Sequence, residues 1–215
     1  MWANRIIRFL LICAAKTRLF VRPTVIGREN LSSSGGVVIA SNHLSTFDPI
    51  GLFAPIVKFR PDVTFLAMAE LFRSPITGRI LRWFGIIPVH RGTDTAVEAS
   101  RVGVTVLAAG GAVAAFIEGK ISRTGKLLPP KNGVAYMASE AGVPVIPVAM
   151  VGTNRVKRPG TGWWHWGWRR RYTIVIGKPM TPPQRPSTRQ QRDTFSEEVM
   201  ETIRSLIEMA APSSA

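Results

Sequence analysis

The sequence predicts an α/β fold with a mostly parallel central sheet that is covered by helices on both faces. Two observations predict this class. Short apolar runs, which are typical of buried strands, alternate along the chain with longer stretches of helical periodicity. Strands separated by helices favour parallel pairing and burial on both sides. With 215 residues and 46% hydrophobic content, the chain can bury a sizeable core, and we expect residues 25–215 to form one domain.

Residues 1–24 are expected to form an amphipathic membrane-associating helix. Their apolar run, residues 9–15, is too short to cross a bilayer and is flanked by Arg8 and Lys16. On a helical wheel Arg5, Arg8 and Lys16 cluster opposite most of the apolar side chains, which suits a helix at the surface of an anionic membrane. A helix that packs on the core and exposes its charges is the alternative. We expect a peripheral protein on the cytoplasmic face of the cell membrane.

Apolar runs bounded by glycine, proline or polar residues predict the strands. These runs are residues 37–40, 63–67, 86–89, 112–117, 144–151 and 172–176. The stretches between and after them predict helices at residues 49–57, 76–84, 95–109, 132–141 and 188–209. Pro144 and Pro147 indicate irregular or edge geometry for their strand. The last helix carries an apolar stripe, and Ser187 and Gln190 have the spacing of a capping box.

The formal charge of +15 implies an anionic partner. The candidates are nucleic acid, an acidic membrane surface, and acidic soluble ligands such as a CoA thioester or an acyl carrier protein. The arginines are scattered without a nucleic-acid-binding motif, so nucleic acid is not an expected partner. Cys13, the only cysteine, excludes an intrachain disulfide and a multi-cysteine metal site, and is consistent with a reducing compartment. Three histidines are too few for a histidine-rich metal centre.

A second possible membrane contact lies between residues 161 and 171. Trp163, Trp164, Trp166 and Trp168 occur close together and are followed by three arginines. Aromatic rings beside cationic groups are typical of an interfacial anchor next to lipid phosphates. A hairpin that packs its indoles on the domain is an equally open alternative.

His43 and Asp48 are the candidate catalytic pair. The strand over residues 37–40 ends in a polar loop that carries His43, and Asp48 followed by Pro49 is typical of a helix start. The loop between them lets the carboxylate fold back toward the imidazole. In such a dyad the imidazole acts as general base on a substrate hydroxyl, and the carboxylate fixes its tautomer. The alternative is that His43 closes a loop hydrogen bond and Asp48 only caps the helix.

Residues 42–48, Asn-His-Leu-Ser-Thr-Phe-Asp, resemble the N-H-x-x-x-x-D motif of the glycerolipid acyltransferases, the family of lysophosphatidate and glycerol-3-phosphate acyltransferases. Residues 85–91, 116–119 and 143–148 resemble the family's second, third and fourth motifs, in its order and at about its spacing. The resemblance covers residues 25–178.

The resemblance implies transfer of a fatty acyl group to a hydroxyl of lysophosphatidate or glycerol-3-phosphate, as in phospholipid synthesis. The donor would be acyl-CoA or acyl carrier protein, His43 the base and Asp48 its orienting partner, and no metal or prosthetic group is implied. One alternative is an acyltransferase for another lysolipid or glycolipid acceptor. A noncatalytic protein that binds membranes or polyanions is another, because the charge, the N-terminal segment and the tryptophan cluster suit it as well.

Arg91 is the first candidate for binding the acceptor's phosphate. It follows a strand-like run, which places its guanidinium at the carboxyl end of a strand, where α/β sheets gather their ligands. A guanidinium suits bidentate recognition of phosphate, and the resemblance implies the same role. A surface arginine in a salt bridge is the alternative.

The third block supplies the remaining candidate substrate-binding residues, which are Glu118, Gly119, Lys120, Ser122 and Arg123. Family members typically read F-P-E-G-T-R-S, and the arginine helps to bind the acceptor's phosphate. This chain has Lys120 in place of the threonine and Ile121 in place of that arginine. Either Lys120 or Arg123 supplies the missing charge, or the acceptor differs from plain glycerol phosphate. Glu118 could instead hold its loop by accepting backbone amides.

Overall fold

The computed structural model describes residues 21–83, 86–89, 93–156 and 170–210. Its strands are β1 (Val21–Ile26), β2 (Val37–Ser41), β3 (Val63–Met68), β4 (Ile87–Val89), β5 (Ala112–Phe116), β6 (Val145–Val151) and β7 (Arg170–Ile176). They form one sheet in the order β1-β7-β6-β2-β5-β3-β4. Every neighbouring pair is parallel except β6 and β7, which confirms the predicted mostly parallel sheet.

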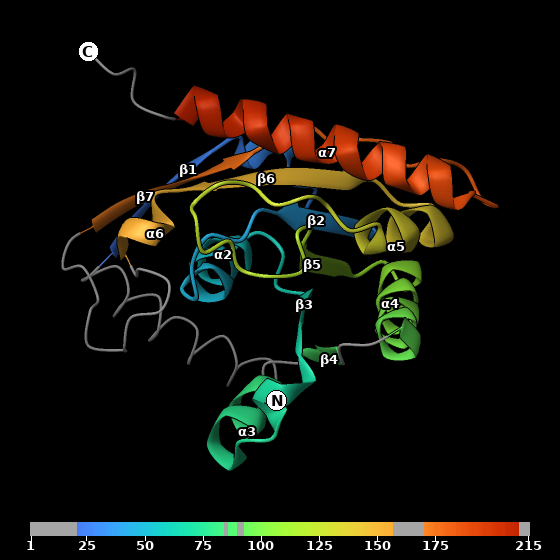
Figure 1. Ribbon diagram of the computed structural model, residues 1–215, viewed down its shortest axis with the longest axis horizontal. Helices are drawn as coiled ribbons and strands as arrows, with labels where there is room; N and C mark the ends of the chain where they lie inside the picture. The colour runs from blue at the N-terminus through green and yellow to red at the C-terminus, as the bar shows by residue number, and fades with distance from the viewer. Residues whose placement is uncertain (1–20, 84–85, 90–92, 157–169, 211–215) are drawn as a thin grey trace.

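Helices cover both faces of the sheet, as predicted (Figure 1). They are α2 (Asp48–Ile56), α3 (Pro75–Trp83), α4 (Thr93–Ala108), α5 (Gly133–Ala141), α6 (Thr153–Val156) and α7 (Arg189–Ala210), with 3-10 turns η1 (Arg28–Asn30) and η2 (Ala69–Phe72). Helices α5 and α7 pack on one face together with α4, and α2 packs on the other. The segment 1–20, which carries most of the expected N-terminal helix, lies outside the described residues.

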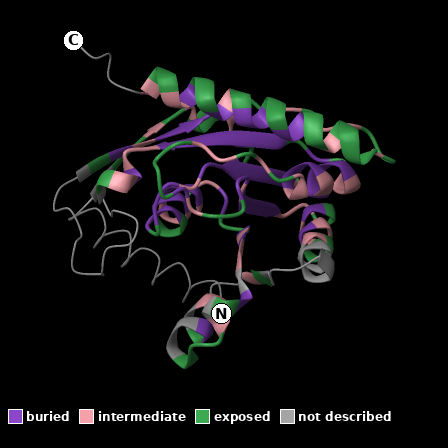
Figure 2. Ribbon diagram, viewed as in Figure 1, coloured by how far each residue is buried: buried purple, intermediate pink, exposed green. Residues whose placement is uncertain are grey.

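Strand β2 shows how one apolar run serves both faces. Val38 and Ala40 face the core beneath α5 and α7, whereas Val37 and Ile39 face the core beneath α2. Successive side chains of a strand point to opposite faces, so a strand buried on both sides reads as a continuous apolar run. Figure 2 shows the buried strands at the centre and the exposed outer side of α7.

Strand β1 was not among the predicted strands. It pairs in parallel with β7 at the edge of the sheet, and the expected boundary between residues 24 and 25 falls inside it. The prediction missed this strand because Pro23 and Arg22 interrupt its apolar pattern. Pro23 is exposed, as expected for a proline in an edge strand.

Strand β6 was expected to have irregular or edge geometry. It lies between β2 and β7, so it is not an edge strand. Its pairing is nevertheless irregular. Val148 pairs with Ile176, and Val145 pairs with Met180. The stretch from residue 176 to residue 180 therefore has one residue more than the stretch of β6 that it faces. Pro147 stands at this irregularity and accepts a hydrogen bond from the amide of Gly177 (2.8 Å). A proline is tolerated here because the regular ladder is already interrupted.

The capping box of α7 lies one residue later than predicted. The Thr188 hydroxyl accepts the amide of Gln191 (3.2 Å), and the Gln191 side chain accepts the amide of Thr188 (2.8 Å). Ser187 instead accepts a hydrogen bond from the hydroxyl of Ser139 on α5 (2.8 Å). The predicted pair, Ser187 and Gln190, has the same spacing as the observed pair, Thr188 and Gln191. The contact of Ser187 with α5 is what decides between the two pairs.

Candidate active site

The site forms where the parallel strands β2 and β5 end. Ser41, the last residue of β2, pairs with Phe116, the last residue of β5. The amide of Ile117 then donates to the Ser41 carbonyl (3.0 Å), so the loops after the two strands leave the sheet side by side. One loop carries His43 and the other Glu118. The carboxyl ends of strands are where α/β folds gather ligands.

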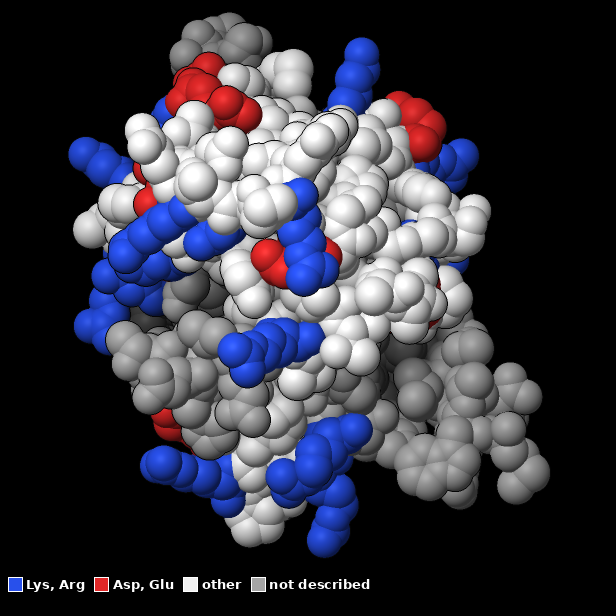
Figure 3. Space-filling view, turned by 90° about the vertical axis from the view of Figure 1, so that its right-hand side faces the viewer, with Lys and Arg blue, Asp and Glu red and all other residues white. Residues whose placement is uncertain are grey.

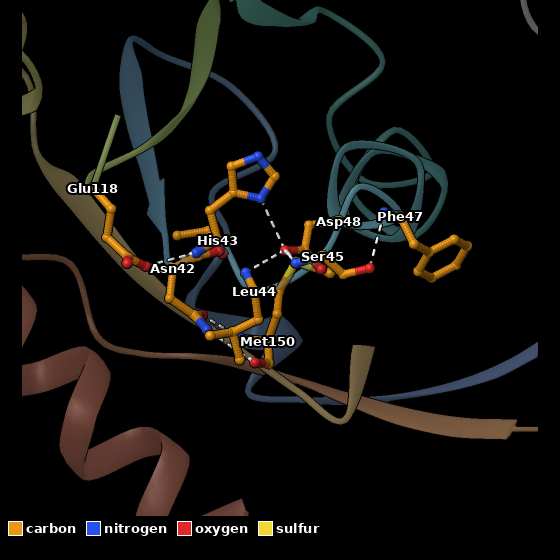
Figure 4. A network of polar contacts seen from close by, with 9 residues as sticks. Asn42, His43, Leu44, Ser45, Phe47, Asp48, Glu118 and Met150 are labelled. Atoms are coloured by element: carbon orange, nitrogen blue, oxygen red, sulfur yellow. Dashed lines mark hydrogen bonds and ion pairs between the residues drawn. The ribbon is translucent and has the colours of Figure 1, made fainter. Parts of the chain in front are cut away.

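Asn42 holds the end of β2 to β6. Its side-chain nitrogen donates to the Met150 carbonyl (3.1 Å), and its side-chain oxygen accepts the Met150 amide (2.7 Å) (Figure 4). The side chain thereby continues the contact between the two strands where their backbone pairing ends, at Ser41. Asn42 is fully buried, so both hydrogen bonds are shielded from water. The residue before His43 is therefore fixed on the sheet.

His43 and Asp48 come together as predicted. Nδ1 of His43 lies 2.9 Å from Oδ2 of Asp48, and Figure 4 shows the other imidazole nitrogen turned away from that carboxylate. The Asp48 side chain is completely buried, whereas 12% of the His43 side chain is exposed. The carboxylate is thus held inside the protein while the imidazole reaches the surface of the site.

Asp48 fixes the loop as well as the imidazole. Its Oδ2 atom also accepts the main-chain amides of Leu44 (2.6 Å) and Ser45 (2.7 Å). These partners precede α2, so the alternative in which Asp48 only caps the helix is wrong. Oδ2 already accepts two amides and therefore acts as an acceptor, so Nδ1 of His43 is assigned as the donor of their contact, and Nε2 then keeps the lone pair that a general base needs.

Phe116 and Glu118, from the end of β5, hold His43 from the other side. The Phe116 ring stacks on the imidazole, with ring centroids 3.9 Å apart and planes 11° apart. Oε1 of Glu118 accepts the main-chain amide of His43, and Oε2 accepts that of Leu128 (both 2.8 Å). Glu118 is 1% exposed, and these contacts support the loop-holding role. Burial raises the pKa of Glu118, although the two amides act in the opposite direction.

Ser122 ties the loop after β5 to the loop that carries His43. Its amide donates to the His43 carbonyl (2.8 Å), and its hydroxyl donates to the Lys126 carbonyl (2.5 Å). The side chain is fully buried. The expected substrate contact of Ser122 stays a prediction, and its observed partners belong to the loop.

Comparisons with known proteins agree with this geometry. Residues 22–151 match the family described as Acyltransferase, which is more than half of the chain. The chain belongs to this family. It is 29% identical over 144 residues to a chloroplastic 1-acyl-sn-glycerol-3-phosphate acyltransferase from Brassica napus, covering 66% of this chain and 41% of that protein. It is 30% identical over 135 residues to the 1-acyl-sn-glycerol-3-phosphate acyltransferase of Borreliella burgdorferi, covering 62% of this chain and 53% of that protein.

A solved structure extends the likeness over most of the length of this chain. The 1-acyl-sn-glycerophosphate acyltransferase PlsC from Thermotoga maritima superposes with a TM-score of 0.72 and 26% identity. The match covers 98% of this chain and 81% of that one. By contrast, the chain spans about half the length of the Brassica and Borreliella relatives.

The structure describes only some of the residues that are expected to bind phosphate. Lys120 and Arg123 are exposed on the loop after β5, and Ile121 between them is partly buried. Gly119 has a φ of +68°, a left-handed conformation that suits glycine, and it turns the chain outward directly after Glu118. Arg91 lies outside the described residues, as does the tryptophan cluster. Their roles therefore stay predictions.

Two residues of the site have roles that the sequence did not reveal. Asn42 bridges β2 and β6, and Phe116 stacks on His43. Both stand inside the quoted motifs, directly before His43 and two residues before Glu118. Their position beside the predicted functional residues was the available signal, but their partners lie 108 and 73 residues away in the sequence.

Proposed function

We propose that this protein transfers a fatty acyl group from acyl-CoA or acyl carrier protein to the free hydroxyl of 1-acylglycerol-3-phosphate. The His43–Asp48 dyad at the carboxyl ends of β2 and β5 carries this proposal. The names of the Brassica, Borreliella and Thermotoga proteins support the choice of acceptor.

The geometry suits direct transfer without a covalent enzyme intermediate. Nε2 of His43 accepts the proton of the acceptor hydroxyl while that oxygen attacks the thioester carbonyl, and Asp48 stabilises the imidazolium that forms. Collapse of the tetrahedral intermediate breaks the carbon–sulfur bond and leaves an ester. The departing thiolate takes the proton back from Nε2, so His43 and Asp48 return to their starting state.

The acceptor's phosphate would be held by Arg91 together with Lys120 or Arg123. Lys120 and Arg123 are exposed on the loop that Ser122 fastens to His43, so a phosphate bound there would lie on the dyad's side of the sheet. Ile121 favours a second candidate, an acyltransferase for a lysolipid or glycolipid that lacks this phosphate, because isoleucine offers no charge.

The protein would act as a peripheral enzyme on the cytoplasmic face of the membrane. The charge of +15 and the amphipathic segment 1–24 support this placement. Among the described residues, none of the helices combines the length and the apolar character that a membrane span requires.

An acceptor panel tests the proposal. Purified protein and H43A would each be given a long-chain acyl donor, either acyl-CoA or an acylated carrier protein. The acceptors would be glycerol-3-phosphate, lysophosphatidate and their phosphate-free counterparts. Both acylated lipid and free thiol would be measured. We expect product with lysophosphatidate and a loss of about 10³-fold in turnover for H43A, within the usual range for a removed general base. Undiminished turnover in H43A would exclude the dyad mechanism.

A charge variant of the loop separates the two acceptor candidates. K120A/R123A should raise KM for lysophosphatidate about tenfold, because each charge-assisted hydrogen bond to phosphate contributes about 1.5–3 kcal/mol before screening at an exposed site. K178A is the control, because Lys178 is exposed and follows β7, which runs antiparallel to β6, so it lies toward the amino end of β6 and away from the dyad. Equal rates with and without the acceptor phosphate would favour the glycolipid or neutral lysolipid instead.

A further inference from the structure

Tyr172 on β7 makes a buried hydrogen bond to the helix that carries Asp48. Its hydroxyl donates to the main-chain carbonyl of Gly51, in the first turns of α2, over 2.8 Å. Tyr172 is 4% exposed. Burial, and then the negative charge of Asp48, raise the pKa of Tyr172 well above its usual range, so the phenol stays protonated and remains a donor.

The Gly51 carbonyl needs this donor because of Pro55. In an α-helix the carbonyl of residue 51 accepts the amide of residue 55, and here residue 55 is a proline within α2. Proline has no N–H, and its ring also crowds the carbonyl four residues earlier. The Tyr172 hydroxyl thus supplies the hydrogen bond that α2 cannot supply for itself.

The same turn is packed tightly from two further sides. A Cβ atom added at Gly51 would lie 2.7 Å from Cε1 of Phe47 and 3.2 Å from Cε of Met150, so this position accepts only glycine without a shift. The ring of Phe47 meets that of Tyr172 edge to face, with centroids 5.4 Å apart at 85°. Phe47 directly precedes Asp48. The start of α2 is therefore held by β7 and β6 rather than by its own loop alone.

We propose that Tyr172 is a positioning residue for the His43–Asp48 dyad, acting through its hydrogen bond to Gly51. This inference rests on the proposed acyl transfer. Tyr172 touches neither His43 nor substrate in this role. It fixes the turn that carries Asp48, which in turn holds Nδ1 of His43 and the amides of Leu44 and Ser45.

Removing only the hydroxyl of Tyr172 leaves the buried carbonyl of Gly51 without a hydrogen-bond donor. The carbonyl can find another donor only if α2 moves. Such a movement displaces Asp48 relative to His43, and a misplacement of about 1 Å in a catalytic group costs up to about 100-fold in rate. We expect Y172F to lower kcat about tenfold and to leave KM within about twofold. Substrate binding is spared because Tyr172 and Gly51 are buried on the α2 side of the core.

Two variants make the test specific. Y136F is the matched control, because Tyr136 is the only other tyrosine and lies on α5, on the opposite face of the sheet, beneath the guanidinium of Arg192. P55A restores an N–H four residues after Gly51. In the Y172F background it should therefore recover most of the lost kcat, whereas P55A alone should change kcat by less than about twofold.

A spectroscopic measurement keeps this inference separate from the proposed reaction. The Nδ1 proton of His43, donated to a carboxylate, gives a downfield proton resonance that is assigned by its loss in H43A. We expect this resonance to shift and broaden in Y172F, to stay in Y136F and to return in P55A/Y172F, even if no acceptor is turned over. An unchanged resonance in Y172F overturns the positioning role. Additive effects of P55A and Y172F on that resonance, or on kcat once turnover is found, overturn it too, because they show that the Gly51 carbonyl is not the link.

Discussion

Glu118 joins the chemistry of the site to the folding of its loops. Its two oxygens receive the amides of His43 and Leu128, so one buried carboxylate connects the loop after β2 with the loop after β5. A carboxylate is suited to this because both of its oxygens accept hydrogen bonds. A glutamine presents one oxygen and one NH2 group, and the NH2 group faces an amide that also donates.

We predict that E118Q lowers the free energy of unfolding by about 1–3 kcal/mol, because one partly buried amide loses its acceptor. The difference in the free energy of unfolding between wild type and E118Q depends on pH. Burial raises the pKa of Glu118 above its ordinary value of 4.5, so the stability from proton binding is present below 4.5 and is lost as the pH rises through the raised pKa. Wild type should therefore lose part of its advantage over E118Q across that window, and the part that stays at higher pH is the cost of the amide that glutamine leaves without an acceptor.

Urea denaturation of both proteins from pH 4.5 upward measures this difference. E198Q, at an exposed position on α7, is the control and should change stability by less than about 0.5 kcal/mol. An advantage of wild type that grows with pH would show that the two amides, and not burial, dominate the titration of Glu118.

The residues of the site differ in how much the sequence reveals of them. His43 and Asp48 were predicted because a strand end, a loop and a helix start are local signals. Ser122 was placed among the substrate-binding residues, yet its hydroxyl bonds to Lys126, a contact set by the shape of the loop. Tyr172 gave no signal, because its partner Gly51 is 121 residues away in the sequence.

Arg60 shows how elements at the amino ends of the central strands are joined. It lies between α2 and β3, is fully buried, and donates to the carbonyls of Ser32 (3.1 Å) and Gly35 (2.9 Å) in the segment before β2. Its guanidinium also binds Asp62 through two hydrogen bonds of 2.9 and 2.7 Å. A buried guanidinium is tolerated only when its donors are satisfied, so the starts of β2 and β3 are set together.

We predict that D62N destabilises the fold by about 1 kcal/mol at pH 7, since 41% of the Asp62 side chain is exposed and solvent screens the pair. The hydrogen bond from Arg60 lowers the pKa of Asp62 below its ordinary value of 3.8. Stability from this pair is therefore present above 3.8 and is lost as the pH falls through the lowered pKa.

Thermal or urea unfolding of wild type and D62N between pH 7 and pH 3 checks the direction in which their difference in stability changes with pH. The gap between wild type and D62N should narrow toward the acidic end, while E201Q, which removes an exposed pair with Arg204 on α7, should change stability by about 0.3–0.5 kcal/mol at pH 7. A gap of the same size at pH 3 as at pH 7 would assign the effect to lost packing and not to charge.

At the scale of elements, the sequence predicted the strands and helices whose apolar pattern is continuous. It missed β1, whose pattern is broken by Arg22 and Pro23 and whose partner β7 lies far along the chain. It also missed the short helix α6, because four residues are too few to show a period. No local pattern encodes the antiparallel pairing of β6 and β7, because the direction of a strand relative to its neighbour is set by the fold as a whole.

The whole molecule carries its charge unevenly. Helix α7 has five exposed acidic residues, which are Asp193, Glu197, Glu198, Glu201 and Glu208, and only three arginines. The excess of Lys and Arg therefore lies on the rest of the chain, and Figure 3 shows such side chains spread over one face beside a few small acidic groups. An anionic surface attracts the molecule through its basic parts, and α7 is the element least suited to face that surface.

This asymmetry gives a prediction for membrane binding. The protein should sediment with vesicles that contain anionic lipid, should bind vesicles of phosphatidylcholine weakly, and should be released as salt shortens the Debye length from about 10 Å at 0.1 M. Reversing Arg5 and Arg8 in the N-terminal segment, R5E/R8E, should weaken anionic binding at least about tenfold, because each cation near such a surface contributes about 1 kcal/mol. R189E/R204E makes the same change in net charge on α7 and should leave binding within about twofold.

If both double variants weaken binding equally, net charge and not the N-terminal segment governs the contact with the membrane. If neither does, the amphipathic helix is not an electrostatic anchor, and the alternative in which it packs on the core gains support.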